Sequence, residues 1–343
     1  MPLVPMRQIL DEAAKKGYGV PHFNVNNMEQ AQAIMRGAEE VESPVIMAAS
    51  KGALKYSDML FLRNIMNACV ERYPKIPIAL HLDHGTNVEI CKTAIDLGFS
   101  SVMMDGSLEE DGKTPRSYDD NIAVTRKVVN FAHPLGITVE GELGCLGGIE
   151  DGIGSGEEKL TNPDQVKEFV EKTKVDALAV SIGTSHGAYK FKIQPDPDKN
   201  LLAMNIIRRI HELCPNLHMV MHGSSSVPQE LIAQINQYGG DIKEAYGVPL
   251  WAIKEGIAAG VRKVNVDTDL RLAVTATIRK ILHDTPEAFD PRKYLGPARD
   301  AMKTIIIERY NTFGSAGHAY DYEPKTLEDM KIFYEESELQ SSR

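Results

Sequence analysis

Cysteine is scarce in this sequence, and its four residues stand far apart with no CxxC pair among them (Cys69, Cys91, Cys145 and Cys214). This usage excludes a disulfide framework or a cysteine-rich metal site and indicates reduced thiols. Long apolar runs are also missing: aliphatic stretches last only a few residues, and the N-terminus lacks the apolar core of a signal peptide. We therefore expect a cytoplasmic protein with no membrane partner.

The chain also has no excess of positive charge. Its 343 residues carry 38 Lys and Arg against 48 Asp and Glu, a net charge of −10. An acidic surface argues against nucleic acid as the main partner, so any phosphate-binding region must be a local exception. The composition, 43% hydrophobic and 25% charged, is that of a globular protein and not of a disordered one.

Eight short apolar runs, rich in Val and Ile and bounded by Gly, Pro or Asn, predict strands. They cover residues 19–26, 44–50, 76–84, 101–106, 138–144, 177–183, 218–224 and 261–269. Amphipathic segments between them predict helices, for example over 28–42, 57–73, 87–98, 162–174 and 228–239. Strands that alternate with helices pair in parallel, and eight such units predict a (β/α)8 TIM barrel.

We expect two parts in the chain. Residues 1–285 form the catalytic barrel, whose last unit ends with the helical stretch 268–284. Residues 286–343 form a C-terminal helical extension, with helices near 298–312 and 326–337, that packs on the barrel or on a second subunit. Two long loops, 144–160 with six glycines and 184–200, are candidate lids, although plain surface loops would look similar.

Polar residues gather at the ends of the predicted strands, which in a barrel open to one shared mouth. In chain order these ends carry Asn24, Ser50, Asp83 with His84, Asp105, Glu142, His186, His222, and Asn265 with Asp267. Three imidazoles from separate strands, His84, His186 and His222, can converge on one divalent ion and leave a position open for substrate. Each is followed by Gly, which lets a loop or ligand approach the backbone closely.

The carboxylates at the mouth allow several roles. Asp83 is a candidate general acid or base on a substrate hydroxyl, or else a hydrogen-bond partner of a histidine. Asp105 and Glu142 are candidates for a second metal position, or else caps of loop amides. His81 shares a strand face with Asp83, so it either orients a neighbour or is an ordinary core histidine. The same alternation predicts that Asp83 and His84 cannot both point inward from a regular strand.

Two groups of residues flanking the histidines suit anions. The serine-rich turn that contains Gly223, Ser224 and Ser225 follows the seventh strand, and residues 265–269 follow the eighth, the usual phosphate site of this fold. Gly187 could add a backbone amide. On the other side of the mouth, Ser50 and Arg271 could hold a second anion, although Arg271 could equally form a surface ion pair. Two anion sites beside one metal suggest a bisphosphorylated substrate.

These residues carry a resemblance to a known family. The segments HLDHG (81–85), VEGELGCLGGIEDG (139–152), GTSHGAYKF (183–191), MHGSSSVPQE (221–230) and NVDTDLR (265–271) resemble the class II, metal-dependent fructose-1,6-bisphosphate aldolases. The likeness runs from about residue 1 to residue 330. It is greatest to the subgroup from carbon-fixing and related bacteria, which often also accepts sedoheptulose 1,7-bisphosphate and acts in the Calvin cycle as well as in glycolysis.

The resemblance implies a role for each matching residue. Zinc would be held by His84, His186 and His222, with Asp105 and Glu142 at an alternate metal position. Asp83 would exchange the proton of the C4 hydroxyl, and Glu150 the proton of dihydroxyacetone phosphate, in a zinc-stabilised enediolate mechanism. The residues implied for substrate binding are Asn24, Ser50, Gly187, Gly223, Ser224, Ser225, Asn265, Val266, Asp267, Thr268 and Arg271.

The resemblance also implies a monovalent cation (Na⁺ or K⁺) near the phosphate loop and a homodimer or higher homo-oligomer, in which Arg271 could come from the neighbouring subunit. The chain departs from many relatives at one point, because it reads GGIEDG where they read GGEEDG (147–152). Ile149 therefore replaces the first of two acids, and Glu150 is the one that remains.

Three other functions are open from the sequence. A Schiff-base aldolase would use Lys263, which shares a strand face with Asn265 and Asp267. A metal-dependent barrel hydrolase would usually carry HxH on the first strand, which here reads HFNVN (22–26). A sugar-phosphate-binding barrel without catalytic activity would have lost a metal ligand or the acid/base, whereas Asp83 and all three histidines are present.

Overall fold

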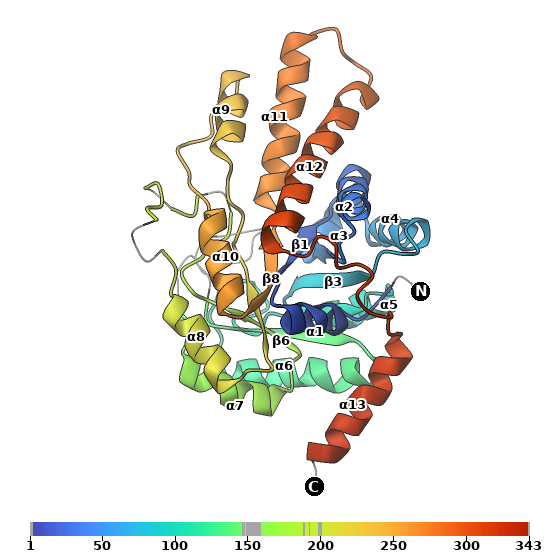
Figure 1. Ribbon diagram of the computed structural model, residues 1–343, viewed down its shortest axis with the longest axis vertical. Coiled ribbons are helices and arrows are strands. Elements are labelled where there is room, and N and C mark those ends of the chain that lie inside the picture. Colours follow the sequence, from blue (N-terminus) through green and yellow to red (C-terminus); the bar gives the residue numbers. More distant parts are fainter. Residues whose placement is uncertain are drawn as a thin grey trace.

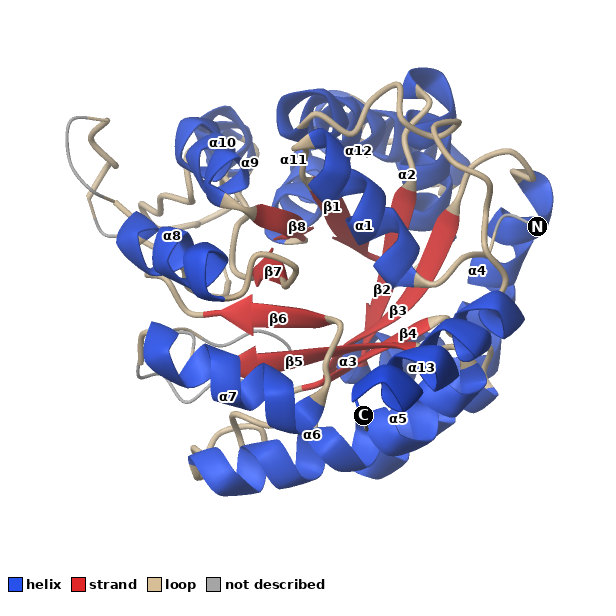
Figure 2. Cartoon of the chain, turned by 60° about the horizontal axis from the view of Figure 1, so that its bottom comes forward, coloured by secondary structure: helices blue, strands red, loops and turns tan. Residues whose placement is uncertain are grey.

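A closed barrel of eight parallel strands forms the centre of the protein, in a computed structural model that describes residues 3–145, 148, 159–187, 189–191, 193–197 and 201–341. Each strand pairs with the next, and the last closes onto the first (Figure 2). The strands are β1 (Val20–Asn24), β2 (Val45–Ser50), β3 (Ile78–Gly85), β4 (Ser101–Met104), β5 (Thr138–Leu143), β6 (Ala177–Val180), β7 (His218–Met221) and β8 (Val261–Val266). The predicted TIM barrel is confirmed.

Helices surround the strands and extend past the barrel at one end, where α11 and α12 run together (Figure 1). The first seven are α1 (Met6–Lys16), α2 (Met28–Val41), α3 (Lys51–Ser57), α4 (Met59–Arg72), α5 (Val88–Asp96), α6 (Tyr118–Ala132) and α7 (Pro163–Thr173). The others are α8 (Met204–Leu213), α9 (Gln229–Gln237), α10 (Leu250–Ala259), α11 (Thr268–Asp284), α12 (Arg292–Phe313), α13 (Leu327–Ser341) and the short 3₁₀ helix η1 (His133–Leu135).

Local sequence explains where several of these helices begin. The side chains of Asn27, Asn87 and Asn162 each accept a hydrogen bond from a backbone amide in the first turn of the helix that follows. Such caps satisfy amides that otherwise have no partner. The predicted helices over 28–42, 87–98 and 162–174 are confirmed to within two residues, because their caps are visible in the sequence.

The structure adds helices that the strand–helix count did not require. The predicted helix over 57–73 corresponds to α4. A separate helix, α3, precedes it and begins directly after β2. Two helices, α9 and α10, separate β7 from β8, where one was predicted. Helix α1 precedes the first strand and closes the N-terminal end of the barrel, where Met6, Ile9 and Leu10 pack against inward-facing apolar residues of the strands.

A β-bulge in β3 brings Asp83 and His84 to the same side of the strand. His81 and Leu82 pair with Ser101 and Val102 of β4, but the next pair joins Gly85 to Met104, so β3 contains one extra residue. His84 occupies the left-handed region with φ of 47°. A bulge interrupts the alternation of a strand. The expectation that both side chains cannot point inward applied to a regular strand, and the bulge removes that condition, so both contact residues of the barrel mouth.

The extension that follows the barrel packs on its outer helices. Residues Met302, Ile306 and Tyr310 of α12 are buried in the main hydrophobic core, and α12 lies against α2 and α11. Arg309 reaches from α12 to the buried carboxylate of Asp269 in α11, with its Nη2 2.8 Å from Oδ2. The same carboxylate accepts hydrogen bonds from the backbone amides of Ser226 and Val227, in the turn after β7.

At the N-terminal end of the barrel, Asp176 anchors a second buried polar cluster. Its carboxylate lies 2.7 Å from Arg7 Nη1 and 3.0 Å from His133 Nε2, and it accepts the backbone N–H of Val139. Burial alone would raise the pKa of Asp176, but His133 and Arg7 hold it well below its usual range. The carboxylate is therefore ionised in the folded protein at neutral pH.

Asp176→Asn should lower the free energy of unfolding by about 3 kcal/mol at pH 7, because it removes one partner of a buried charged cluster. A carboxyl with a lowered folded-state pKa stabilises the fold above its unfolded pKa of about 3.9, and that contribution is lost as the pH falls. The difference between the two proteins should therefore stay constant above pH 5 and shrink at lower pH. Urea unfolding at pH 7 and pH 4 measures it, and a gap that widens with acid would contradict the assignment.

Among the described residues, no helix combines the length and the apolar character needed to cross a membrane.

Candidate metal centre and active site

The three predicted histidines meet at the C-terminal mouth of the barrel. His84 stands at the end of β3, His222 directly follows β7, and His186 lies in the loop after β6. One ring nitrogen from each lies within 4.8 Å of the other two, and all three side chains are buried. The closest pair is His222 Nδ1 and His84 Nε2, 3.0 Å apart. Residues far apart in the sequence thus form one compact group of nitrogen donors.

This group suits a divalent ion. His186 Nδ1 is buried with no hydrogen-bond partner among the described residues, which is costly unless something else engages it. Burial lowers the pKa of His186 and of His222, so both rings are neutral and can offer a lone pair. A set of three imidazoles is a donor set typical of catalytic zinc.

Two carboxylates, those of Asp105 and Glu142, lie next to His84. Asp105 Oδ2 lies 3.0 Å from His84 Nδ1, and Glu142 Oε2 lies 4.0 Å from the same atom. The three residues form a second group whose candidate ligand atoms lie within 4.8 Å of one another. Burial opposes a charge on His84, but Asp83 and the hydrogen-bonded Asp105 raise its pKa to about 10.

The carboxyl group of Glu142 has an unusual pKa. Burial and the neighbouring Asp105 raise the pKa of its carboxyl well above the usual range, and its Oε2 has no hydrogen-bond partner among the described residues. A buried carboxyl beside another acid is the arrangement that a cation stabilises. The pair of acids therefore fits the predicted second metal position.

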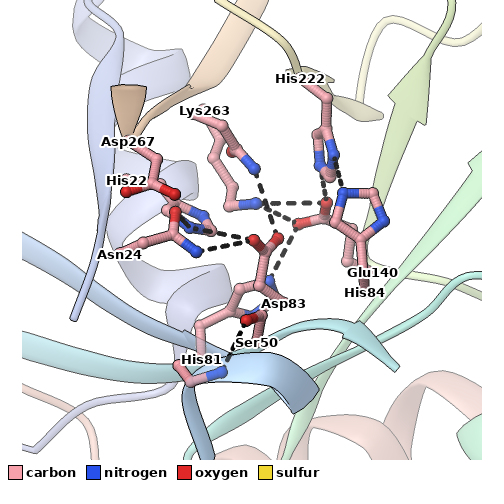
Figure 3. A network of polar contacts seen from close by, with 12 residues as sticks. His22, Asn24, Ser50, His81, Asp83, His84, Glu140, His222, Lys263 and Asp267 are labelled. Carbon is pink, nitrogen blue, oxygen red and sulfur yellow. Dashed lines mark hydrogen bonds and ion pairs between the residues drawn. The ribbon is translucent and has the colours of Figure 1, made fainter. Parts of the chain in front are cut away.

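Asp83 is held firmly at the mouth (Figure 3). Asn24 donates a hydrogen bond to one carboxylate oxygen at 3.0 Å, and Asn265 reaches the other at 3.4 Å. Burial alone would raise the pKa of Asp83. Neighbouring side chains, chiefly those of His22 and His84, instead hold this pKa well below the usual range. Asp83 is thus an ionised, oriented carboxylate beside the three imidazoles.

Most of the predicted substrate-binding residues lie around this group. A cavity of about 10 Å³ at the mouth is lined by Asn24, Asp83, His84, His186, Lys190, Gly223, Ser224, Ser225, Asn265 and Asp267. Gly187, Val266 and Thr268 adjoin these residues along the chain, and Thr268 is the first residue of α11. Gly223 has φ of 60°, and a Cβ there would meet the carbonyl oxygen of Ser185 at 2.6 Å.

The two residues expected at the second anion have local partners. The Ser50 hydroxyl accepts the backbone N–H of Ala53 and so caps α3. Arg271, in the first turn of α11, forms an ion pair with Asp267 at 2.5 Å. Its side chain is 42% exposed, so it faces solvent as well as its partner. The predicted base Glu150, with Ile149 beside it, lies outside the described residues.

Sequence reasoning missed two residues near the three histidines, which we call the metal group. Glu140 contacts His222, and it faces the barrel interior from β5 together with Glu142, two residues later. The two-residue spacing of the glutamates in VEGEL (139–143) places both side chains on one face of a strand, and this spacing could have indicated Glu140 from the sequence. Lys190 lines the cavity and donates a hydrogen bond to the carbonyl of Ser185. It stands in the HGAYKF segment, four residues after His186. From the sequence, this loop is only a candidate lid, and Lys190 has no role of its own.

The Lys263 alternative does not suit the structure. Its side chain is fully buried, and its Nζ lies 2.9 Å from Glu140 Oε2 and 3.2 Å from Oε1. A Schiff-base lysine must have its amine free to attack a ketone, whereas the Lys263 amine is engaged by both oxygens of Glu140.

Comparison with known proteins identifies the family of the chain. The family model of class II fructose-bisphosphate aldolase matches residues 4–318. The fructose-bisphosphate aldolase of Pseudomonas aeruginosa is 55% identical over 352 aligned residues, with 99% of each chain covered. That of Nostoc commune is 54% identical and covers 99% of this chain and 97% of its own.

The solved structures that resemble this chain are also aldolases. The crystal structure of the YdjI aldolase from Escherichia coli K12 superposes with a TM-score of 0.71 at 29% identity, covering 92% of this chain and 99% of that one. A putative fructose-1,6-bisphosphate aldolase from Coccidioides immitis has a TM-score of 0.72 at 28% identity, with 92% and 98% covered. The chain therefore belongs to the class II fructose-bisphosphate aldolase family.

Proposed function

We propose that this protein catalyses the reversible aldol cleavage of fructose 1,6-bisphosphate to dihydroxyacetone phosphate and glyceraldehyde 3-phosphate. The observation that carries the proposal is the group of His84, His186 and His222, whose ligand atoms lie within 4.8 Å of one another beside the oriented carboxylate of Asp83. Membership in the class II aldolase family supports the assignment of this group as the metal centre.

The proposal assigns the metal site to zinc. His84, His186 and His222 would hold it, and Asp105 with Glu142 would offer the alternate position. When bound, the ion supplies a Lewis acid that polarises a carbonyl oxygen and stabilises the negative charge that develops there. The neutral state of His186 and His222 and the unpaired Nδ1 of His186 support this assignment.

Asp83 is the proposed acid/base on the C4 hydroxyl. Its ionised carboxylate accepts the hydroxyl proton as the C3–C4 bond breaks, and it returns the proton in the condensation direction. The hydrogen bonds from Asn24 and Asn265 keep both oxygens in place at the mouth. Glu150 is proposed to exchange the proton of dihydroxyacetone phosphate from the glycine-rich loop.

The phosphate of dihydroxyacetone phosphate is assigned to the turns after β6, β7 and β8. Gly187, Gly223, Ser224, Ser225, Asn265, Val266, Asp267 and Thr268 are the proposed contacts. The start of α11 supports this choice, because helix N-termini present free amides to anions. Ser50 and Arg271 are proposed to meet the second phosphate, and a Na⁺ or K⁺ ion is proposed near the first.

Three further properties belong to the same proposal. We include sedoheptulose 1,7-bisphosphate as an additional substrate, and a homodimer or a higher homo-oligomer as the active form. The protein acts in the cytoplasm, a reducing compartment in which its four unpaired cysteines stay reduced.

Metal removal tests the function directly. Dialysis against EDTA should lower the rate of fructose 1,6-bisphosphate cleavage at least ~10³-fold, since the Lewis acid contributes several kcal/mol, and zinc should restore it. Borohydride with substrate should leave the restored activity unchanged, because no lysine adduct forms. A coupled assay with fructose, tagatose and sedoheptulose bisphosphates ranks the substrates. Full cleavage by metal-free protein, or none of any ketose bisphosphate by the zinc form, would refute the proposal.

A further inference from the structure

A charged pair lies inside the barrel next to the three histidines, and one of its members contacts His222 directly. Glu140 of β5 and Lys263 of β8 point toward each other across the barrel, and both side chains are fully buried (Figure 3). Burying two charges costs several kcal/mol per ion, and replacing such a pair by apolar residues often stabilises a protein. Stability alone is therefore a poor reason for this pair.

The contacts of Glu140 indicate another reason. Its Oε1 lies 2.9 Å from His222 Nε2 and 3.2 Å from Lys263 Nζ, and its Oε2 lies 2.9 Å from the same Nζ. An ionised carboxylate can only accept hydrogen bonds, so His222 must carry its proton on Nε2. Nδ1 is then the nitrogen with the free lone pair, and it is the one that faces His84 Nε2 at 3.0 Å.

Lys263 holds in place the Glu140 carboxylate, which determines the nitrogen of His222 that carries the proton. It holds both oxygens of Glu140, while His81 Nε2 stands farther away, 3.6 Å from Oε2. His81 is itself tied by Nδ1 to the Ser101 hydroxyl at 2.8 Å. These contacts keep Oε1 directed at His222.

We propose that Glu140 and Lys263 are positioning residues that select the tautomer and the ring orientation of His222, so that this histidine meets the metal through Nδ1. The inference rests on the proposed metal site and adds two residues to it. Hydrogen-bond partners of this kind commonly contribute 10- to 100-fold to metal affinity.

The test measures zinc affinity by competition with a chromogenic chelator, together with the visible spectrum of the Co²⁺-substituted protein. Glu140→Gln should weaken zinc binding about 10- to 100-fold. An amide offers one acceptor where the carboxylate offers two, and its NH₂ can donate to His222 Nε2, which moves the ring proton to Nδ1. The Co²⁺ spectrum should change as well, because the ligand geometry changes.

Three further variants separate the effect of the Glu140 charge from that of its contact with His222. Glu140→Asp keeps the negative charge beside Lys263 but withdraws the carboxylate from His222, so zinc binding should weaken as it does in Glu140→Gln. Lys263→Met should also weaken it. The double variant Glu140→Gln with Lys263→Met should bind zinc no more weakly than Glu140→Gln alone, because Lys263 acts only through Glu140. Thermal melting of each metal-free variant reports whether it is folded.

Asp176→Asn is the matched control. Asp176 is also a buried carboxylate between an imidazole and a cation, but at the opposite end of the barrel. This variant should lose stability and keep zinc affinity within twofold of the unmodified protein. If folded Glu140→Gln and Glu140→Asp both bind zinc within threefold of the unmodified protein, the inference is overturned. If the unmodified protein itself binds no zinc at the histidines, the proposed function fails first, and the inference fails with it.

Discussion

His222→Ala is expected to abolish stoichiometric zinc binding and to lower the rate of fructose 1,6-bisphosphate cleavage by about 10⁴-fold, since Lewis-acid stabilisation of several kcal/mol is lost. His222 connects the group to the barrel interior, with its Nδ1 3.0 Å from His84 Nε2 and its Nε2 2.9 Å from Glu140 Oε1. Alanine leaves only two imidazoles at the site. The fold should persist, because Glu140 keeps its ion pair with Lys263.

Metal analysis of the purified protein, thermal melting and a coupled assay measure this effect. His283→Ala is a suitable control, since His283 is an exposed histidine near the end of α11, far along the chain from any ligand. It should keep both zinc and activity. Undiminished cleavage by His222→Ala protein that contains no metal would show that the imidazole group is not the catalytic centre.

The second large effect is expected at Asp83. Asp83→Asn should lower cleavage about 10³-fold, within the range that a positioned acid or base contributes, while zinc content stays at one per chain. Asparagine has nearly the same shape, so it replaces the group with little change in packing. It cannot take up the proton of the C4 hydroxyl, however, and bond cleavage then lacks its acceptor.

Proton exchange of dihydroxyacetone phosphate provides the internal control for this variant. That half of the reaction involves no C4 hydroxyl, so Asp83→Asn should exchange the proton with deuterated water within tenfold of the unmodified rate, as followed by NMR. Cleavage and exchange should therefore separate. An equal loss of both would mean that Asp83 serves to bind the metal or the phosphate and not to move the C4 proton.

The barrel and the metal group could be predicted because their signals are local in the sequence. Each strand is a short apolar run, and three of the helices that follow begin at an asparagine cap. His84, His186 and His222 each end or follow such a run, and a closed barrel leaves no other place for strand ends than one mouth.

Other parts of the site depend on register and on contacts across the barrel. The inward position of both Asp83 and His84 follows from one extra residue in β3, which no pattern of alternation reveals. The pairing of Glu140 with Lys263 joins residues on β5 and β8, and only the closed sheet brings them together. Helix α10 was missed because a βα unit is normally counted with one helix, whereas two lie between β7 and β8.

The contact between Arg309 and Asp269 has a consequence for the order in which the molecule is completed during synthesis. All eight strands leave the ribosome before Arg309 does, yet the backbone amides of Ser226 and Val227 are held by a carboxylate whose buried cation is that arginine. A nascent chain that ends within α11 has every strand of the barrel but lacks the arginine that binds this carboxylate beneath the serine-rich turn. We therefore expect the turn to reach its final shape late, after the polypeptide has grown past its last strand.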